Sequence, residues 1–158
     1  MRIVLVGAGR LATNLGQALR LAGHDIVAVY SHTKANAEKL CSLVGGIASD
    51  DIAALPKEAD VFIVAVKDAA LPNVAKQLAK GREQQVFFHT AGSMPLSVFE
   101  GLSMHYGVFY PMQTFSKERQ VDFLPIPVFL EASDDATLSL ARTLAESISR
   151  HEIGRAHV

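Results

Sequence analysis

Residues 2–22 read RIVLVGAGRLATNLGQALRLA, and this stretch decides the fold that the sequence predicts. Residues 3–6 form an apolar run of strand length, and Gly7-Ala8-Gly9 forces a tight turn directly after it. Apolar residues then recur at helical spacing from Leu11 to Ala22, and Gly23 is placed as a helix stop. A strand, a glycine turn and a helix in this order predict half of a phosphate-binding unit.

The glycine pattern predicts that this turn binds a dinucleotide. Gly7 and Gly9 match the first two positions of G-x-G-x-x-G, and Ala12 takes the third, where a small residue lets the helix pack closely on the strand. The free N–H groups and positive dipole end of the helix favour a pyrophosphate. The residues expected to hold it are Gly7, Ala8, Gly9, Arg10 and Leu11. A turn that only packs helix on strand needs no ligand, which is the alternative.

Strand-like and helix-like segments alternate along most of the remaining chain. Strands are expected at 25–30, 61–66, 86–90, 105–109 and 127–130. Longer helices are expected after Thr33 and Asp68, each of which can cap a helix, and from Ser133 with Asp134 and Asp135, with short helical turns at 51–55 and 95–100. Residues 48–59 are otherwise expected to be a connecting segment. The alternation predicts an α/β fold with a doubly wound, mostly parallel sheet.

Length and composition agree with one domain. The 158 residues carry a net charge of −1, which gives no reason to expect nucleic acid or an anionic membrane as a partner. No apolar run has the length of a membrane span, and Met1 leads straight into the first strand. The single cysteine, Cys41, fits a reducing compartment, so we expect a cytoplasmic protein. Cys41 lies on an apolar helix stripe, which favours a core residue over a nucleophile.

The residues after the second predicted strand bear on the choice of cofactor. An NAD-binding fold usually has Asp or Glu about 20 residues after the glycines, where it accepts from the ribose 2′-hydroxyl. Here the segment contains Ser31, His32, Thr33 and Lys34 and no carboxylate. Hydroxyl groups and cations suit a 2′-phosphate, so we expect NADP(H) rather than NAD(H). The alternative is that Thr33 only caps a helix and its neighbours are solvated.

The carboxyl ends of the later strands are where an open α/β sheet binds its ligand. The residues expected to border the nicotinamide are Ala65, Val66, Lys67, Thr90, Ala91 and Gly92. The residues expected on the substrate side are Tyr110, Pro111 and Gln113. His89 and His105 are acid–base candidates, but each lies within a strand-like run, which favours a hydrogen-bonded structural histidine. The sequence has no metal-ligand spacing, nucleophile elbow or P-loop.

Five segments occur in one order: GAGRLATNLGQAL, VYSHT, ADVFIVAVKD, FFHTAGS and GVFYPMQTF. Together they resemble the Rossmann-like NADP oxidoreductases in which a dinucleotide-binding domain precedes a helical C-terminal domain of unknown function. The chain is more distantly similar to pyrroline-5-carboxylate reductase, the deazaflavin-dependent NADP oxidoreductases and the 6-phosphogluconate dehydrogenase-like enzymes. The resemblance covers residues 1–150 and implies hydride transfer to or from a small carbonyl, imine or alcohol substrate. That family commonly has His-Pro where this chain has Tyr110-Pro111, so no role is transferred from the histidine.

The resemblance also implies that a domain is missing. Enzymes of this superfamily generally dimerise through the C-terminal helical domain, so a homodimer is expected only with that domain. Residues 152–158, EIGRAHV, interrupt the preceding apolar periodicity and match the translation of a common sequencing adapter. We therefore expect residues 1–150 to be the dinucleotide-binding domain, residues 151–158 to be a non-native tail, and the chain to be a fragment without turnover. A genuine polar tail is the alternative.

Two alternatives to an oxidoreductase are considered: a nucleotide-sensing module, and a methyltransferase or flavin-binding fold. A nucleotide-sensing module would use the same glycine turn without moving a hydride, and the lack of an evident catalytic residue favours it. Methyltransferase and flavin-binding folds usually have an acidic residue after the second strand, which this sequence lacks.

Overall fold

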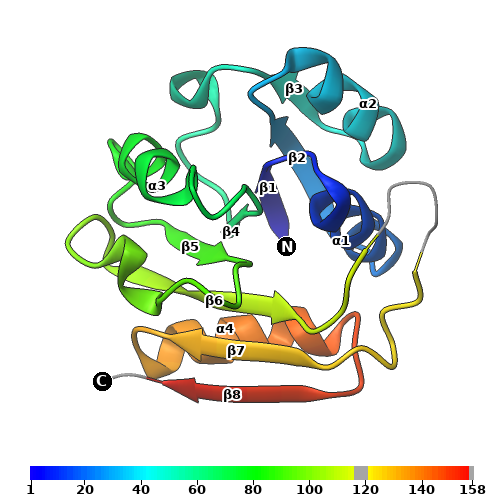
Figure 1. Ribbon diagram of the computed structural model, residues 1–158, viewed down its shortest axis with the longest axis vertical. Helices are drawn as coiled ribbons and strands as arrows, with labels where there is room; N and C mark the ends of the chain where they lie inside the picture. Colours follow the sequence, from blue (N-terminus) through cyan, green and yellow to red (C-terminus); the bar gives the residue numbers. More distant parts are fainter. Residues whose placement is uncertain (116–120, 157–158) are drawn as a thin grey trace.

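One sheet runs through the middle of the molecule, with helices on both of its faces (Figure 1). The computed structural model describes residues 1–115 and 121–156, and within them the sheet has eight strands in the order β3-β2-β1-β4-β5-β6-β7-β8. The strands are β1 (Arg2–Val6), β2 (Asp25–Tyr30), β3 (Ile47–Ser49), β4 (Val61–Val64), β5 (Val86–His89), β6 (His105–Pro111), β7 (Val128–Ala132) and β8 (Glu152–Ala156). The helices are α1 (Arg10–Leu21), α2 (Lys34–Val44), α3 (Leu71–Ala79) and α4 (Asp135–Glu146), with short 3₁₀ helices η1 (Ile52–Ala54) and η2 (Leu96–Phe99).

The strand order explains where a ligand can approach the sheet. β1 pairs in parallel with β2 on one side and with β4 on the other, so the chain passes to the opposite side of β1 after β3. The crevice at such a reversal of strand order is the usual ligand site of an open α/β sheet. Every strand pair is parallel except β6 with β7. The predicted doubly wound, mostly parallel α/β sheet is therefore confirmed.

The strands are buried on both faces because their side chains alternate between two apolar cores. Ile3 and Leu5 of β1 belong to the apolar core that includes residues of α1, α2 and α4, whereas Val4 and Val6 belong to the core that includes residues of α3, η1 and η2. All four of these side chains are fully buried. The alternation explains why the central strands are continuous apolar runs in the sequence. It also anchors β1, which leads directly into the glycine turn, in both cores.

Several element boundaries differ from the sequence prediction. β3 was not predicted; it overlaps the start of the expected connecting segment 48–59, and it is a short strand at the edge of the sheet. The helix expected to be capped by Asp68 begins at Leu71 with Ala70 at the N-cap, so this prediction was wrong. Thr33 holds the N-cap position of α2 without a side-chain cap bond. At α4 the cap is Asp134, whose carboxylate accepts from the Thr137 N–H at 2.7 Å.

Part of the expected tail is included in the sheet. Residues 152–156 form β8, which pairs in parallel with β7. His157 and Val158, the last residues of the predicted tail, lie outside the described residues. The non-native origin of residues 151–158 stays a prediction that the sequence of the source gene would decide.

Candidate functional site

A cleft of about 540 Å³ lies at the carboxyl ends of β1, β4 and β5. It is lined by Gly9, Arg10, Leu11, Ala65, Val66, Lys67, Asp68, Thr90 and Ala91. Three segments far apart in the sequence therefore meet at one edge of the sheet, and among them are eight of the residues that the sequence analysis expected to bind the cofactor. Asp68 also lines the cleft; it directly follows the residues expected to border the nicotinamide and was expected to cap the next helix.

The glycine turn fits closely against the end of β4. Gly7 has a φ of +126°, and a Cβ added to it would collide with the carbonyl oxygen of Ala65. The Gly7 N–H donates to the Tyr30 carbonyl at 2.8 Å, and the Ala65 N–H donates to the Val6 carbonyl at 2.8 Å. A side chain is excluded here by both conformation and space. Gly7 therefore holds the turn between β2 and β4.

Gly9 differs from Gly7 in its backbone conformation and in the space around its Cα. It has an ordinary φ of −80°, and a Cβ added to it would have no described atom within 4 Å. Because Gly9 also lines the cleft, a side chain there would project into free space that a ligand can use. Ala8, between the two glycines, is buried and packs in the core.

The first turn of α1 offers hydrogen-bond donors to this space. Helix α1 begins at Arg10, its N-cap residue Gly9 supplies no side chain, and the turn contains no acidic residue. Across the described residues, no acceptor is bonded to the backbone N–H groups of residues 10–12. These amides and the positive dipole end suit an anion. The exposed side chain of Arg10 adds a cation at the same place.

The segment after β2, residues 31–34, forms a rim that is separate from the cleft lining. Ser31 is only 9% exposed, its N–H donates to the Ser49 carbonyl at 3.0 Å, and its hydroxyl oxygen accepts from the Thr33 N–H at 3.2 Å. His32, Thr33 and Lys34 are exposed. None of these four residues lines the cleft described above. They lie instead at the end of β2, next to the strand that carries the glycine turn.

The loops after β4 and β5 form the far wall of the cleft. The Thr90 N–H donates to the Val64 carbonyl at 3.2 Å, and the Thr90 side chain is buried. The Ser93 hydroxyl donates to the Asp68 carboxylate at 2.6 Å, which links the two loops. Val66 and Ala65 are half-buried, whereas the Lys67 ammonium extends from an exposed position on the rim.

The residues predicted on the substrate side lie beyond this wall. The ring of Tyr110 lies directly against the backbone of Gly92, because a Cβ on Gly92 would overlap the ring. Pro111 is buried at the end of β6, and the exposed Gln113 donates its N–H to the Pro111 carbonyl at 3.0 Å. The structure thus brings Gly92 and Tyr110 together, but none of these four residues is part of the cleft lining.

A family model described as a Rossmann-like domain matches residues 1–110, which include the glycine turn, β4, β5 and nearly all of β6. The chain belongs to this family. The fold of the Rossmann-like domain is of the NAD(P)-binding oxidoreductase type, and its ligand edge is the edge that holds the cleft.

Solved structures and curated proteins extend this result. A Bacteroides fragilis protein described as a candidate NADP oxidoreductase is 43% identical, with a TM-score of 0.94 over 99% of this chain and 61% of its own. An imine reductase of Myxococcus stipitatus, solved with NADP⁺ and as a variant with NAD⁺, shares the fold at 15% identity and a TM-score of 0.79, over 99% of this chain and 55% of its own. A 2-dehydropantoate 2-reductase of Archaeoglobus fulgidus is 31% identical over 83 residues, which are 50% of this chain and 28% of the relative. The chain thus spans less than two thirds of each of them.

His89 of the Rossmann-like domain supports the turn after β5. Its side chain is fully buried, with Nε2 at 3.0 Å from the Pro95 carbonyl oxygen and Nδ1 at 3.1 Å from the Ala91 nitrogen. A carbonyl only accepts, so Nε2 carries the proton and Nδ1 accepts from the Ala91 N–H. This is the neutral imidazole, and burial lowers its pKa although the Pro95 carbonyl and nearby carboxylates act in the opposite direction. His89 is a structural histidine, as the sequence favoured.

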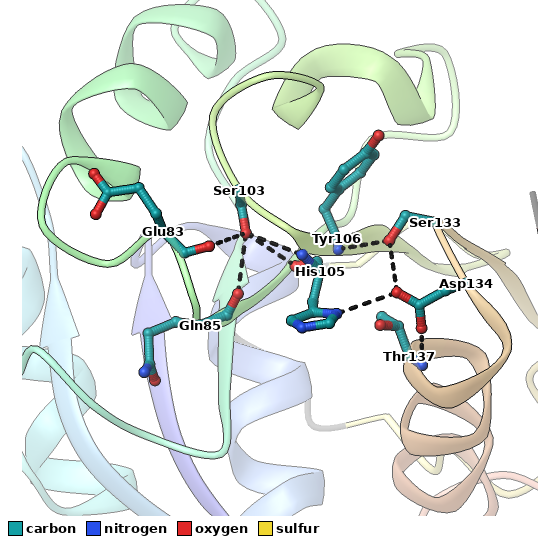
Figure 2. A network of polar contacts seen from close by, with 8 residues as sticks. All are labelled: Glu83, Gln85, Ser103, His105, Tyr106, Ser133, Asp134 and Thr137. Carbon is teal, nitrogen blue, oxygen red and sulfur yellow. Dashed lines mark hydrogen bonds and ion pairs between the residues drawn. The ribbon is translucent and has the colours of Figure 1, made fainter. Parts of the chain in front are cut away.

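His105 is also held in a structural network, at the other end of the sheet. Figure 2 shows its Nδ1 beside the carboxylate of Asp134, at 3.1 Å, next to the start of α4. The same carboxylate accepts from the Thr137 N–H and from the Ser133 hydroxyl. Burial would raise the pKa of Asp134, but the Thr137 hydrogen bonds and His105 outweigh it and lower the pKa. The network caps α4 at the opposite edge from the cleft.

We expect the stability of the domain to decrease in mildly acidic solution because of His89. Its pKa in the folded state lies below the ordinary value of 6.5, so the unfolded chain binds more protons between the two values. The neutral imidazole therefore stabilises the folded state fully when the pH is above that ordinary pKa. This stabilisation is lost as the pH falls from the ordinary pKa toward the folded-state pKa. Urea unfolding of the wild type and of His89→Gln, near neutral pH and about 1.5 units below 6.5, measures this. An equal pH effect in both proteins would contradict the assignment, since His24, whose pKa is also lowered, is present in both.

Two kinds of feature are not found among the described residues. They contain no group of three or more His, Cys, Asp or Glu residues placed to hold a metal ion. No helix within them has the length and apolar character needed to cross a membrane. Cys41 is half-buried and packs against the edge of the core, so it is less buried than the core position that was expected, and burial and then Glu38 raise the pKa of its thiol.

Proposed function

We propose that this chain binds NADP(H) in the cleft and belongs to an enzyme that transfers hydride to or from a small carbonyl, imine or alcohol. The observation that carries the proposal is the set of unbonded amides at the start of α1, facing the open space beside Gly9. A dinucleotide pyrophosphate has the charge and size for this position. The 43% identity to the Bacteroides fragilis protein supports the oxidoreductase assignment.

The residues that line the cleft form two groups, one for each part of the proposed cofactor that would lie there. The amides of Gly9, Arg10 and Leu11 would hold the pyrophosphate, with the Arg10 side chain as a counter-charge. Ala65–Lys67 and Thr90-Ala91 would border the nicotinamide, mainly through backbone contacts, with Gly92 and Tyr110 behind them. When bound, the nicotinamide supplies or accepts the hydride, and the protein orients the ring and excludes water.

The whole enzyme is part of the same proposal. Since the chain spans 61% of the Bacteroides fragilis protein, we propose a further domain that closes the site, supplies the catalytic acid and forms a homodimer. We place the protein in the cytoplasm because its single cysteine fits a reducing compartment.

The rim after β2 supports NADP(H) over NAD(H). Residues 31–34 carry two hydroxyls, an imidazole and an ammonium and no carboxylate, and three of the four side chains are exposed. The Ser31 hydroxyl oxygen accepts from the Thr33 N–H, and its own proton is available for a phosphate oxygen. A carboxylate here would repel a 2′-phosphate.

We expect Ser31→Asp to weaken NADPH binding about tenfold or more without weakening NADH binding. The aspartate keeps an acceptor for the Thr33 N–H, so the turn is preserved while a negative charge is added. Fluorescence titration of both cofactors gives the two affinities. Ser139→Asp, on the exposed face of α4, is the matched control for the charge and should change neither. NADH binding as tightly as NADPH in the wild type, with no effect of Ser31→Asp, would refute the phosphate rim.

A nucleotide-sensing module without turnover is the second candidate. It is favoured by one observation: both histidines considered for acid–base chemistry are held in structural hydrogen bonds. A full-length protein that binds NADPH but does not oxidise it with a panel of ketones and imines would support the sensor and exclude the reductase for those substrates.

A further inference from the structure

The two loops that border the nicotinamide end of the cleft are joined by one side-chain hydrogen bond. The Ser93 hydroxyl, in the loop after β5, donates to a carboxylate oxygen of Asp68, in the loop after β4, at 2.6 Å. This is the short distance typical of a hydroxyl bonded to an ionised carboxylate. Asp68 itself lines the cleft, and both residues are exposed.

The loop after β5 is held internally by hydrogen bonds from His89 and is joined to the loop after β4 by the Ser93–Asp68 bond. His89 fixes it from below, because its two ring nitrogens bond the backbone of Ala91 and Pro95. Beyond the Thr90 N–H bond to Val64, the Ser93–Asp68 pair is the link between the two loops that the described residues show. Among the described residues, no other side-chain hydrogen bond joins the turn at 91–93 to the loop after β4.

Within residues 1–115 and 121–156, the bond to Ser93 is the hydrogen bond shown for the Asp68 carboxylate. It precedes α3 by three residues, where a carboxylate often caps a helix, yet α3 has Ala70 at its N-cap and no side-chain cap bond. The backbone carbonyls of Lys67 and Asp68 accept from the first amides of the helix instead. The Asp68 side chain is thus directed to Ser93 and not to the helix.

We propose that Asp68 and Ser93 are positioning residues that set the width of the cleft at its nicotinamide end. This inference rests on the proposed function, since it assigns the pair to the nicotinamide half of the bound dinucleotide. In the proposed binding mode the pyrophosphate would lie at the start of α1 and the adenosine end at the end of β2, whereas the Asp68 and Ser93 side chains belong to the loops after β4 and β5. The pair should therefore affect ligands that contain the nicotinamide and leave unaffected those that lack it.

The test compares NADPH with 2′-phospho-ADP-ribose, which has the same phosphates and adenosine but no nicotinamide. Asp68→Ala and Ser93→Ala should each weaken NADPH binding about threefold to tenfold, the range for losing one exposed hydrogen bond to a charged group. The double variant should be no weaker than either single variant, because both remove the same bond. Ser93→Thr, which keeps the hydroxyl, should retain wild-type affinity. Binding of 2′-phospho-ADP-ribose should be unchanged throughout.

Matched controls are two exposed residues for which no side-chain hydrogen bond is recorded among the described residues. Ser97→Ala lies in η2, close to the same loop, and Asp25→Ala lies at the opposite edge of the sheet. Both should bind NADPH like the wild type. Additive losses in the double variant, equal losses for both ligands, or no loss at all would overturn the positioning role alone. A wild-type chain that binds neither ligand would overturn the proposed function and the positioning role together.

Discussion

Gly7→Ala should destabilise the folded chain by about 3 kcal/mol and abolish dinucleotide binding. Gly7 has a φ of +126°, which alanine adopts only with strain, and the added methyl group would collide with the Ala65 carbonyl. The collision involves backbone at the end of a central strand, so the clash can be relieved only if β1 and β4 move apart. Urea unfolding and NADPH titration of the variant measure the two effects.

Gly9→Ala separates the structural use of a glycine from its use in binding. Gly9 has an ordinary φ and free space around the added methyl group, so the stability of this variant should stay within about 0.5 kcal/mol of the wild type. The same methyl group projects into the cleft, where it would displace the pyrophosphate and weaken NADPH binding by about tenfold or more. NADPH bound by Gly9→Ala as tightly as by the wild type would show that the pyrophosphate does not approach this turn.

Arg82→Met should cost about 4 kcal/mol of folding free energy, the second large effect expected. The Arg82 side chain is 2% exposed and donates to four backbone carbonyls, those of Ile52, Leu55, Pro56 and Leu78. Its guanidinium carbon also lies 5.9 Å from the centre of the Phe62 ring. Methionine fills much of the space but leaves the carbonyls without a donor.

The effect of Arg82 should be confined to stability. The four carbonyls belong to α3 and to the segment around η1, and none of them lines the cleft, so NADPH affinity below the unfolding transition should be unchanged. Burial lowers the pKa of the guanidinium without neutralising it at ordinary pH. Arg20→Met is the control, since the exposed Arg20 donates to one carbonyl, that of Leu43, and its loss should cost below about 1 kcal/mol. Equal destabilisation by the two substitutions would contradict the role given to Arg82.

The fold could be predicted where local pattern decides it. The alternation of β1 side chains between two cores makes residues 3–6 a continuous apolar run, and the helical spacing after Gly9 identifies α1. β3 was missed because three residues at a sheet edge, one of them the exposed Ile47, carry no periodicity. The antiparallel direction of β7 depends on which strand it meets, and the sequence of a strand does not encode its partner.

The candidate site could be predicted where it depends on local sequence or on the order of the strands. The glycine turn is a local feature, and the strand ends follow from the topology, so Ala65–Lys67 and Thr90-Ala91 were found in the cleft. The Ser93–Asp68 bond joins residues 25 positions apart, and it exists only because the ends of β4 and β5 are adjacent. Asp68 shows the difficulty: three residues before α3, its sequence context indicates a cap, and only the three-dimensional arrangement directs it to Ser93.

The position of β1 has a consequence for how the protein is made. β1 leaves the ribosome before the other described strands, yet it is paired on both sides only when β4 has been synthesised, and Gly7 faces the carbonyl of Ala65, just after that strand. A nascent chain that ends before this point has the glycine turn without its opposite wall. The cleft is therefore incomplete until β4 and the loop after β5 have emerged from the exit tunnel, so a ligand that needs the whole cleft cannot assist the earliest folding of the chain.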